Sequence, residues 1–141
     1  AIKRGIEAYI PQNNRSQLVQ WGSNTVLLDA YNANPSSMAA AIDNLLTMSD
    51  EKKKVLILGD MFELGNYAAE EHQRIVDKLK NYEWEGVYLI GSNFAKTQSP
   101  YPQYETFEAF KEIFPTLSFN NCLLLIKGSR GMALERLIQV K

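Results

Sequence analysis

The chain has 141 residues, a formal net charge of -1 and an apolar fraction of 45%, values typical of one soluble globular domain. A charge this close to neutral gives no electrostatic case for binding nucleic acid or an anionic membrane. No apolar run approaches the roughly 20 residues of a membrane span, and residues 1–11 have neither an initiator methionine nor the long apolar core of a signal peptide.

The N-terminal residues predict a connector followed by a hairpin. Isoleucines at helical spacing precede a polar Pro-Gln-Asn-Asn stretch, so we expect residues 1–13 to be a connector from a missing central domain and residues 14–141 to be the domain itself. Weak alternation over residues 16–21, a Gly-Ser-Asn turn signal and an apolar run that ends at Leu28 or Asp29 then predict two antiparallel strands at one side of a sheet.

The segment 29–37 (DAYNANPSS) predicts a strand-to-helix turn, because apolar residues recur at helical spacing after it. Asn34 fits the N-cap and Pro35 the first helical position, where a missing N–H has no consequence. In an open α/β sheet, ligands bind just outside the carboxyl ends of the strands. The turn would therefore present a carboxylate, a phenol and two amides, from Asp29, Tyr31, Asn32 and Asn34. Since Asn and Asp are ordinary turn residues, the local pattern equally allows Asn34 simply to cap the helix and Asp29 simply to tie the turn.

Three further apolar runs predict buried strands at residues 55–58, 87–90 and 122–126. Amphipathic stretches predict helices at about 67–80, from 106 to near Pro115, and after Gly131, while residues 97–105 indicate a loop with a short edge strand. Strands thus alternate with helices. Right-handed crossovers then predict an α/β, doubly wound, mostly parallel Rossmann-like sheet, with one antiparallel strand from the hairpin.

Polar residues follow three of these strands, and all three segments should lie at one edge of the sheet. Asp60 and Glu63 would bind an ammonium group or simply shape their turn. Lys127, Ser129 and Arg130 stand where a strand is expected to meet a helix N-terminus, a place that favours anions. Arginine can grip a carboxylate or phosphate with two parallel hydrogen bonds. The alternative is a loop whose charges face water and whose Ser129 caps the helix.

Several familiar sites are missing from the sequence. It contains neither GxGxxG nor the GxxxxGK[ST] P-loop, so another domain would have to hold the phosphates of a nucleotide. His72, the one histidine, falls on the inward face of its helix, which favours a hydrogen-bonded packing residue over a catalytic base. No cluster of His, Cys and Asp has metal-ligand spacing, and the apolar run around Cys122 favours a buried, inert thiol. We therefore predict no catalytic or metal-binding residue in this chain.

Three motifs together resemble the Mur ligases of bacterial cell-wall synthesis. Residues 29–38 are similar to the family's D-x-Y-N-A-N-P-x-S-M segment, residues 59–65 to its G-D-M-x-E-L-G loop, and residues 127–135 to its K-G-S-R-x-M-x-L-E segment. His72 falls where the family has a histidine. The resemblance covers about residues 10–138 and is nearest to the members that add D-alanyl-D-alanine to a UDP-N-acetylmuramoyl-tripeptide.

The resemblance implies the C-terminal domain of a three-domain, ATP-dependent amide ligase that takes part in peptidoglycan synthesis in the cytoplasm. The missing central domain would hold the P-loop, magnesium and most of the ATP, so the chain alone is expected to be inactive. The implied partners are D-alanyl-D-alanine, the UDP-linked tripeptide and the other two domains of the same chain. The ATP contacts would come from Asp29, Tyr31, Asn32 and Asn34. The substrate contacts would come from Asp60, Glu63, Lys127, Ser129 and Arg130.

One departure from the family pattern concerns the first motif. Many members have two adjacent acids before the small residue and the tyrosine, whereas Leu28 occupies the first of these positions here, so Asp29 is the one candidate acid. Two other interpretations stay open. The chain would otherwise belong to another ligase of the Mur or folylpolyglutamate synthase type, or be a non-catalytic doubly wound interaction module with structural polar loops.

Overall fold

The computed structural model describes residues 17–29, 33–48 and 52–138, and a six-stranded mixed sheet forms its middle layer. The strand order is β1-β2-β6-β3-β4-β5; β1 is antiparallel to β2, and the other neighbouring pairs are parallel. This sheet confirms the predicted fold class and the antiparallel hairpin strand, whereas the predicted connector lies outside the described residues. The strands are β1 (Gln17–Trp21), β2 (Asn24–Asp29), β3 (Lys53–Gly59), β4 (Gly86–Ile90), β5 (Gln103–Tyr104) and β6 (Cys122–Lys127).

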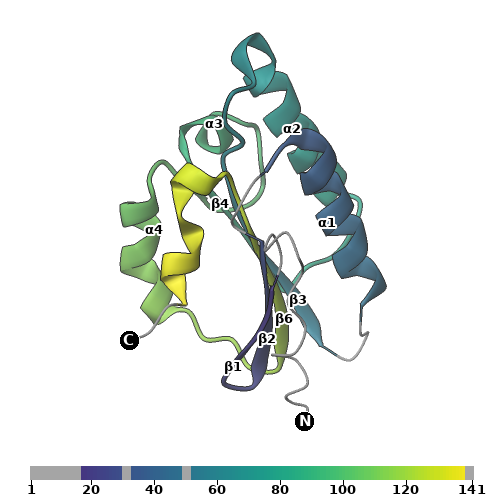
Figure 1. The fold of residues 1–141 in the computed structure, drawn as a ribbon, viewed down its shortest axis with the longest axis vertical. Coiled ribbons are helices and arrows are strands. Elements are labelled where there is room, and N and C mark those ends of the chain that lie inside the picture. The colour runs from purple at the N-terminus through teal and green to yellow at the C-terminus, as the bar shows by residue number, and fades with distance from the viewer. Residues whose placement is uncertain (1–16, 30–32, 49–51, 139–141) are drawn as a thin grey trace.

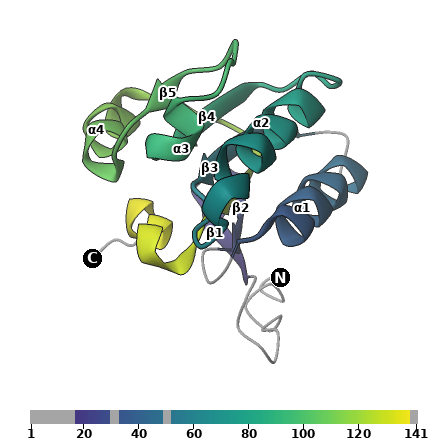
Figure 2. The ribbon, with the colours of Figure 1, turned by 90° about the horizontal axis from the view of Figure 1, so that it is seen from above.

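Helices cover both faces of the sheet (Figure 1, Figure 2). One face packs against α1 (Pro35–Thr47), α2 (Ala68–Leu79) and α3 (Ser92–Ala95). The other face packs against α4 (Phe107–Ile113) and the C-terminal 3-10 helices η4 (Arg130–Met132) and η5 (Leu134–Leu137). Two further 3-10 turns, η2 (Gly65–Tyr67) and η3 (Phe114–Thr116), precede α2 and follow α4. Across residues 17–29, 33–48 and 52–138, no helix has the length and apolar character needed to cross a bilayer.

The apolar strands bury both of their faces, which explains their continuous apolar sequences. In β3, Leu56 and Leu58 belong to the core beneath α1 and α2, while Val55 and Ile57 belong to the core beneath α4. All four side chains are fully buried. Because successive side chains of a strand point to opposite faces, one short run supplies both cores.

Two predicted helix starts are confirmed by their caps. The Asn34 side chain accepts a hydrogen bond from the Ser37 N–H, and the Ser37 hydroxyl accepts one from the Asn34 N–H, which is a reciprocal capping box. The Thr106 side chain caps α4 by accepting from the Ala109 N–H. These caps fix where the chain turns from the sheet into its covering helices.

The structure differs from the predicted elements at two places. The predicted helix after Gly131 is wrong: the chain forms η4 and η5 instead, separated by Ala133 in the left-handed conformation at φ 51°. The apolar spacing predicted a regular helix, but a 3-10 helix also places residues three apart on one side. In addition, the short helix α3 begins two residues after β4, in a segment without helical periodicity.

The topology brings three strand ends together. Strand β6 lies between β2 and β3, although it comes last along the chain. After β3 the chain turns to α2 on one face, and after β6 it turns to η4 and η5 on the other. This reversal is a topological switch point, the place where ligands of open α/β sheets bind beyond the carboxyl ends of the strands.

Candidate functional site

Asp29 and Lys127 end the adjacent parallel strands β2 and β6, and they form an ion pair that we call the rim pair. Their Cα positions are partners in the strand register, so both side chains leave the sheet on the same face. The Lys127 Nζ donates to Asp29 Oδ2 at 2.9 Å. The lysine side chain is 2% exposed and the aspartate side chain 15% exposed. The pair thus presents carboxylate rather than ammonium to the edge of the sheet.

Of the other candidate residues in the first motif, the structure describes Asn34 alone. Asn34 is exposed and caps α1 through Ser37, as the structural alternative for this residue predicted. Tyr31 and Asn32 lie outside the described residues. Contact of these three residues with ATP therefore stays a prediction.

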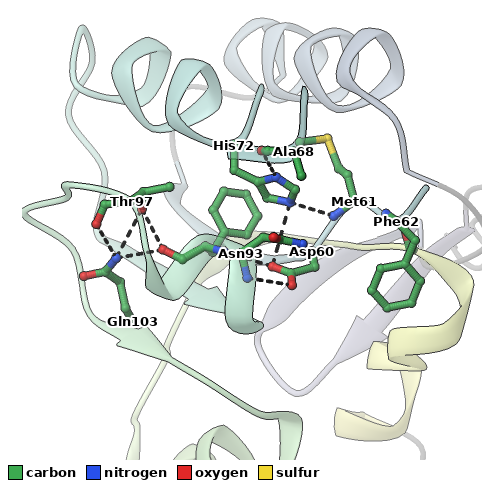
Figure 3. Close-up of polar contacts among 10 residues, drawn as sticks. Asp60, Met61, Phe62, Ala68, His72, Asn93, Thr97 and Gln103 are labelled. Carbon is green, nitrogen blue, oxygen red and sulfur yellow. Dashed lines mark hydrogen bonds and ion pairs between the residues drawn. The ribbon is translucent and has the colours of Figure 1, made fainter. Parts of the chain in front are cut away.

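The three residues that follow β3, Asp60, Met61 and Phe62, form what we call the loop hub (Figure 3). Asp60 is 3% exposed, and its carboxylate accepts from the backbone N–H groups of Asn93 at 2.9 Å and Phe94 at 3.0 Å. These two donors open α3, so Asp60 acts as the cap of that helix. Of the two roles left open for Asp60, shaping the turn fits these contacts, whereas binding of an ammonium group stays a prediction.

The far end of α3 is held as well. The Gln103 side chain donates to the Phe94 carbonyl at 2.7 Å and to the Thr97 carbonyl at 2.9 Å, as Figure 3 shows. Gly91, which leads into α3, has φ 125°, and a Cβ there would overlap the Asp60 carboxylate. A glycine is therefore required where the loop hub meets the end of β4.

His72 extends from α2 to the loop hub and is fully buried. Its Nδ1 lies 2.7 Å from the Ala68 carbonyl oxygen, and its Nε2 accepts from the Met61 N–H at 2.9 Å. The ring also meets Phe94 edge-on at 4.7 Å between centroids. The prediction of a hydrogen-bonded packing histidine on the inward face of this helix is confirmed.

The segment after β6 joins the loop hub from the other side. The Ser129 N–H donates to the Asp60 carbonyl at 3.0 Å, and the Ser129 hydroxyl accepts from the Phe62 N–H at 2.7 Å. Ser129 thus holds the loop hub rather than capping a helix, which corrects the alternative proposed for it. Arg130, the next residue, is exposed and opens the three-residue η4.

One ground for predicting anion binding by this segment was a regular helix start, which the structure does not have. The charge of Lys127 is turned to Asp29, while the exposed Arg130 and Glu63 remain at the surface of the edge. Glu63 has φ 66°, an uncommon conformation for a residue other than glycine. Contact of Arg130 or Glu63 with a ligand stays a prediction.

Two sites excluded on sequence grounds can be compared with the structure. Cys122 is 3% exposed, and burial raises the pKa of its thiol, which disfavours the reactive thiolate. Over the described ranges 17–29, 33–48 and 52–138, no group of three or more His, Cys, Asp or Glu residues is arranged to hold a metal ion.

Sequence reasoning missed the residues that the loop hub contacts. Asn93 and Phe94 take up the Asp60 carboxylate through backbone N–H groups, which no motif reveals. Phe62 was not singled out either, although its ring lies so close to Gly131 that a Cβ there would come within 2.7 Å of it. The one available signal was the Gly91-Ser92-Asn93 run directly after a strand.

Comparison with known proteins places these features in a family. The model of the Mur ligase, glutamate ligase domain, matches residues 14–130. The UDP-N-acetylmuramoyl-tripeptide–D-alanyl-D-alanine ligase of Treponema pallidum is 38% identical over 96% of this chain, and the ligase of the same name from Bacillus subtilis is 28% identical, also over 96%. The chain spans 31% of the first relative and 32% of the second, which is about a third of their length.

Solved structures agree with the fold. The chain superposes on MurF from Acinetobacter baumannii with a TM-score of 0.76 and 26% identity, covering 96% of this chain and 31% of that one. It also superposes on the MurF ligase of Thermotoga maritima in complex with ADP, with a TM-score of 0.75 and 23% identity, covering 93% of this chain and 31% of that one. The sheet and its covering helices are therefore the architecture of a known ligase domain.

Proposed function

This chain is the C-terminal domain of a member of the Mur ligase family, and we propose that it completes an ATP-dependent ligase. The proposed enzyme joins D-alanyl-D-alanine to a UDP-N-acetylmuramoyl-tripeptide. The observation that carries the proposal is the 38% identity, over 96% of the chain, with a ligase of that name. The convergence of the three motifs on one edge of the sheet supports it. The enzyme works in the cytoplasm, with the preceding domains of the same protein as partners of this one.

The proposed reaction has two steps. The free carboxylate of the tripeptide attacks the γ-phosphorus of ATP, which forms an acyl phosphate and releases ADP. The amine of D-alanyl-D-alanine then attacks the acyl carbon, an amide bond forms, and phosphate leaves with the bonding electron pair while the amine loses its proton. Such chemistry depends on positioning and on stabilisation of phosphate charge. The central domain would supply the P-loop and magnesium, which neutralises charge on the phosphates.

The domain described here would close one side of that site. The Asp29 carboxylate is partly exposed at the edge and is held in place by Lys127, so it is suited to accept hydrogen bonds from the ribose hydroxyls of ATP. The Arg130 guanidinium is suited to grip the carboxylate of D-alanyl-D-alanine, which leaves the amine at the other end free to attack. Tyr31, Asn32 and Asn34 belong to the proposed ATP side, and Glu63 to the substrate side.

Asp60, Ser129 and Lys127 have a different part in this proposal. Their polar atoms are engaged within the protein, by α3, by Phe62 and by Asp29. They would act on the substrates by fixing the positions of neighbouring exposed residues. This division separates residues that contact ligands from residues that shape the edge.

Arg130→Ala in the full-length ligase tests the proposal. Loss of the guanidinium should raise the KM for D-alanyl-D-alanine by at least about tenfold, since a hydrogen bond to a charged group contributes about 1.5–3 kcal/mol, and should change the KM for ATP much less. Arg130→Lys should restore part of the loss, because one ammonium replaces a fork of donors. The measurement is steady-state kinetics with each substrate varied in turn.

A matched control is Arg74→Ala, which removes the same charge from an exposed position on α2. It should leave both KM values unchanged. Equal damage to both KM values by Arg130→Ala would assign this residue to domain closure. Damage confined to ATP would assign it to the nucleotide, and either result would contradict the proposed substrate contact.

A further inference from the structure

The hydrogen bonds of His72 define its protonation state. A carbonyl oxygen can only accept, so Nδ1, 2.7 Å from the Ala68 oxygen, must carry a hydrogen. A backbone N–H can only donate, so Nε2, 2.9 Å from the Met61 nitrogen, must be bare. The ring is therefore the neutral Nδ1–H tautomer. The 3.8 Å approach of Nε2 to Asp60 Oδ1 is consequently no ion pair in this state.

His72 is one of two side chains that take up consecutive N–H groups of the loop hub. The Met61 N–H is held by His72 from α2, and the Phe62 N–H is held by Ser129 from the segment after β6. Ser129 also donates its own N–H to the Asp60 carbonyl. The hub thus joins a helix on one face of the sheet to the segment that continues directly into Arg130.

From this arrangement we infer that His72 is a positioning residue of the ligase: as a neutral imidazole it fixes the loop hub, and through Ser129 it fixes the place of Arg130 at the carboxyl edge. The inference deepens the proposed function and depends on it. Its structural part depends on the contacts of His72 alone. His72 is fully buried and acts through Met61, so it touches no substrate.

Two substitutions separate the two hydrogen bonds of the ring. The amide of glutamine reaches about as far as Nε2, so His72→Gln can still accept from the Met61 N–H. The amide of asparagine reaches about as far as Nδ1, so His72→Asn can donate to the Ala68 carbonyl but leaves the Met61 N–H without its acceptor. If the role of His72 were purely structural, the loss of activity would follow the loss of side-chain volume. That loss of volume is larger in His72→Asn but considerable in both variants.

The first measurement is the tautomer. The protein is labelled with ¹⁵N-histidine, and the imidazole signals of His72 are identified as those that the His72→Gln variant lacks. The expected spectrum shows a protonated Nδ1 and a bare Nε2 correlated with the Met61 amide. A protonated Nε2 would overturn the inference whatever reaction the enzyme catalyses.

The second measurement is the kinetics of both variants in the full-length ligase. His72→Asn should lower kcat/KM for D-alanyl-D-alanine on the order of tenfold or more, because small displacements of a positioning group are costly, and His72→Gln should recover most of it. Both variants are compared at a temperature where melting curves show them folded. Equal loss in the two variants, or no loss in either, would overturn the inference.

Failure of the proposed function would look different. Wild-type enzyme that does not join D-alanyl-D-alanine to the tripeptide would contradict the proposed function itself, and with it the catalytic part of the inference. The tautomer and the protection of the Met61 amide from hydrogen exchange would still decide whether His72 holds the loop hub. A fast-exchanging Met61 amide in His72→Asn, but not in His72→Gln, is the expected result.

Discussion

The rim pair and the loop hub lie at neighbouring strand ends, and each contains an aspartate that follows an apolar strand. Asp29 pairs with the Lys127 side chain, and its own side chain is 15% exposed. Asp60 is partnered by two backbone N–H groups of α3, and its side chain is 4% exposed. The Asp29 carboxylate is held by an ion pair but remains partly exposed, whereas the buried Asp60 carboxylate accepts hydrogen bonds from within the protein.

This difference shows that the burial and the partners of an aspartate at a strand end decide how much its removal costs. A pair of side chains can be removed together, since neither partner is then left without the other. Backbone N–H groups cannot be removed, so loss of the Asp60 carboxylate leaves two buried donors unsatisfied. We therefore expect loss of the Asp60 carboxylate to lower the free energy of unfolding more than loss of the rim pair does.

Asp60→Ala should give the largest loss of stability. Two buried N–H groups lose a charged acceptor, and hydrogen bonds to charged groups contribute about 1.5–3 kcal/mol each. We expect the free energy of unfolding to fall by about 3–5 kcal/mol, measured by urea denaturation.

Asp60→Asn is the matched control for that variant. It keeps one acceptor oxygen and turns the other position into a donor, so it should be intermediate. An Asp60→Ala variant within about 1 kcal/mol of wild type would show that α3 does not need its cap, and the contrast between the two regions would fail.

Single substitutions in the rim pair should lower the free energy of unfolding by less, and the double variant should lose almost none of it. Asp29→Ala leaves the buried Lys127 ammonium without this carboxylate and should cost about 2 kcal/mol, less than a fully buried pair because Asp29 is partly exposed. Lys127→Met should cost about 1 kcal/mol. The double variant should lie within about 1 kcal/mol of wild type, because both charges are gone.

The readout for the pair is a double-mutant cycle from urea denaturation. Strict additivity, with the double variant losing about the sum of the two single losses, would mean that the charges do not stabilise each other and that the short contact is incidental.

Much of the fold could be predicted from the sequence because its signals are local. Continuous apolar runs, an Asn-Pro helix start and the helix start at residue 106 each depend on residues close together in the chain. The inward face of α2, with His72 on it, also follows from spacing. The convergence of three strand ends then follows from the general topology of α/β sheets.

The roles of individual site residues could not be predicted, because their partners are distant in the sequence. Asp60 binds N–H groups 33 and 34 residues away, and Ser129 accepts from an N–H 67 residues away. Asp29 and Lys127 are 98 residues apart and meet because β6 inserts beside β2. No local pattern distinguishes an aspartate that caps a remote helix from one that faces a ligand.

The segment after Gly131 shows a second kind of limit. Its apolar residues fit a regular helix, but Ala133 adopts φ 51°, and the chain forms two 3-10 turns instead. Leu134 is fully buried against the sheet, so tertiary packing overrides the local preference. The helix-start argument for anion binding fails with it, while the exposed position of Arg130 is unaffected.

The claim that the rim-pair carboxylate serves ATP is tested most directly by comparing two variants of the full-length ligase. Lys127→Met keeps the Asp29 carboxylate, whereas Asp29→Ala with Lys127→Met removes it, and the two should have similar stability. We predict that kcat/KM for ATP is roughly 10- to 100-fold lower in the double variant than in Lys127→Met, as expected for loss of a charged acceptor worth about 1.5–3 kcal/mol. Equal values of kcat/KM for ATP in the two variants would show that Asp29 only ties the turn, and would contradict the account.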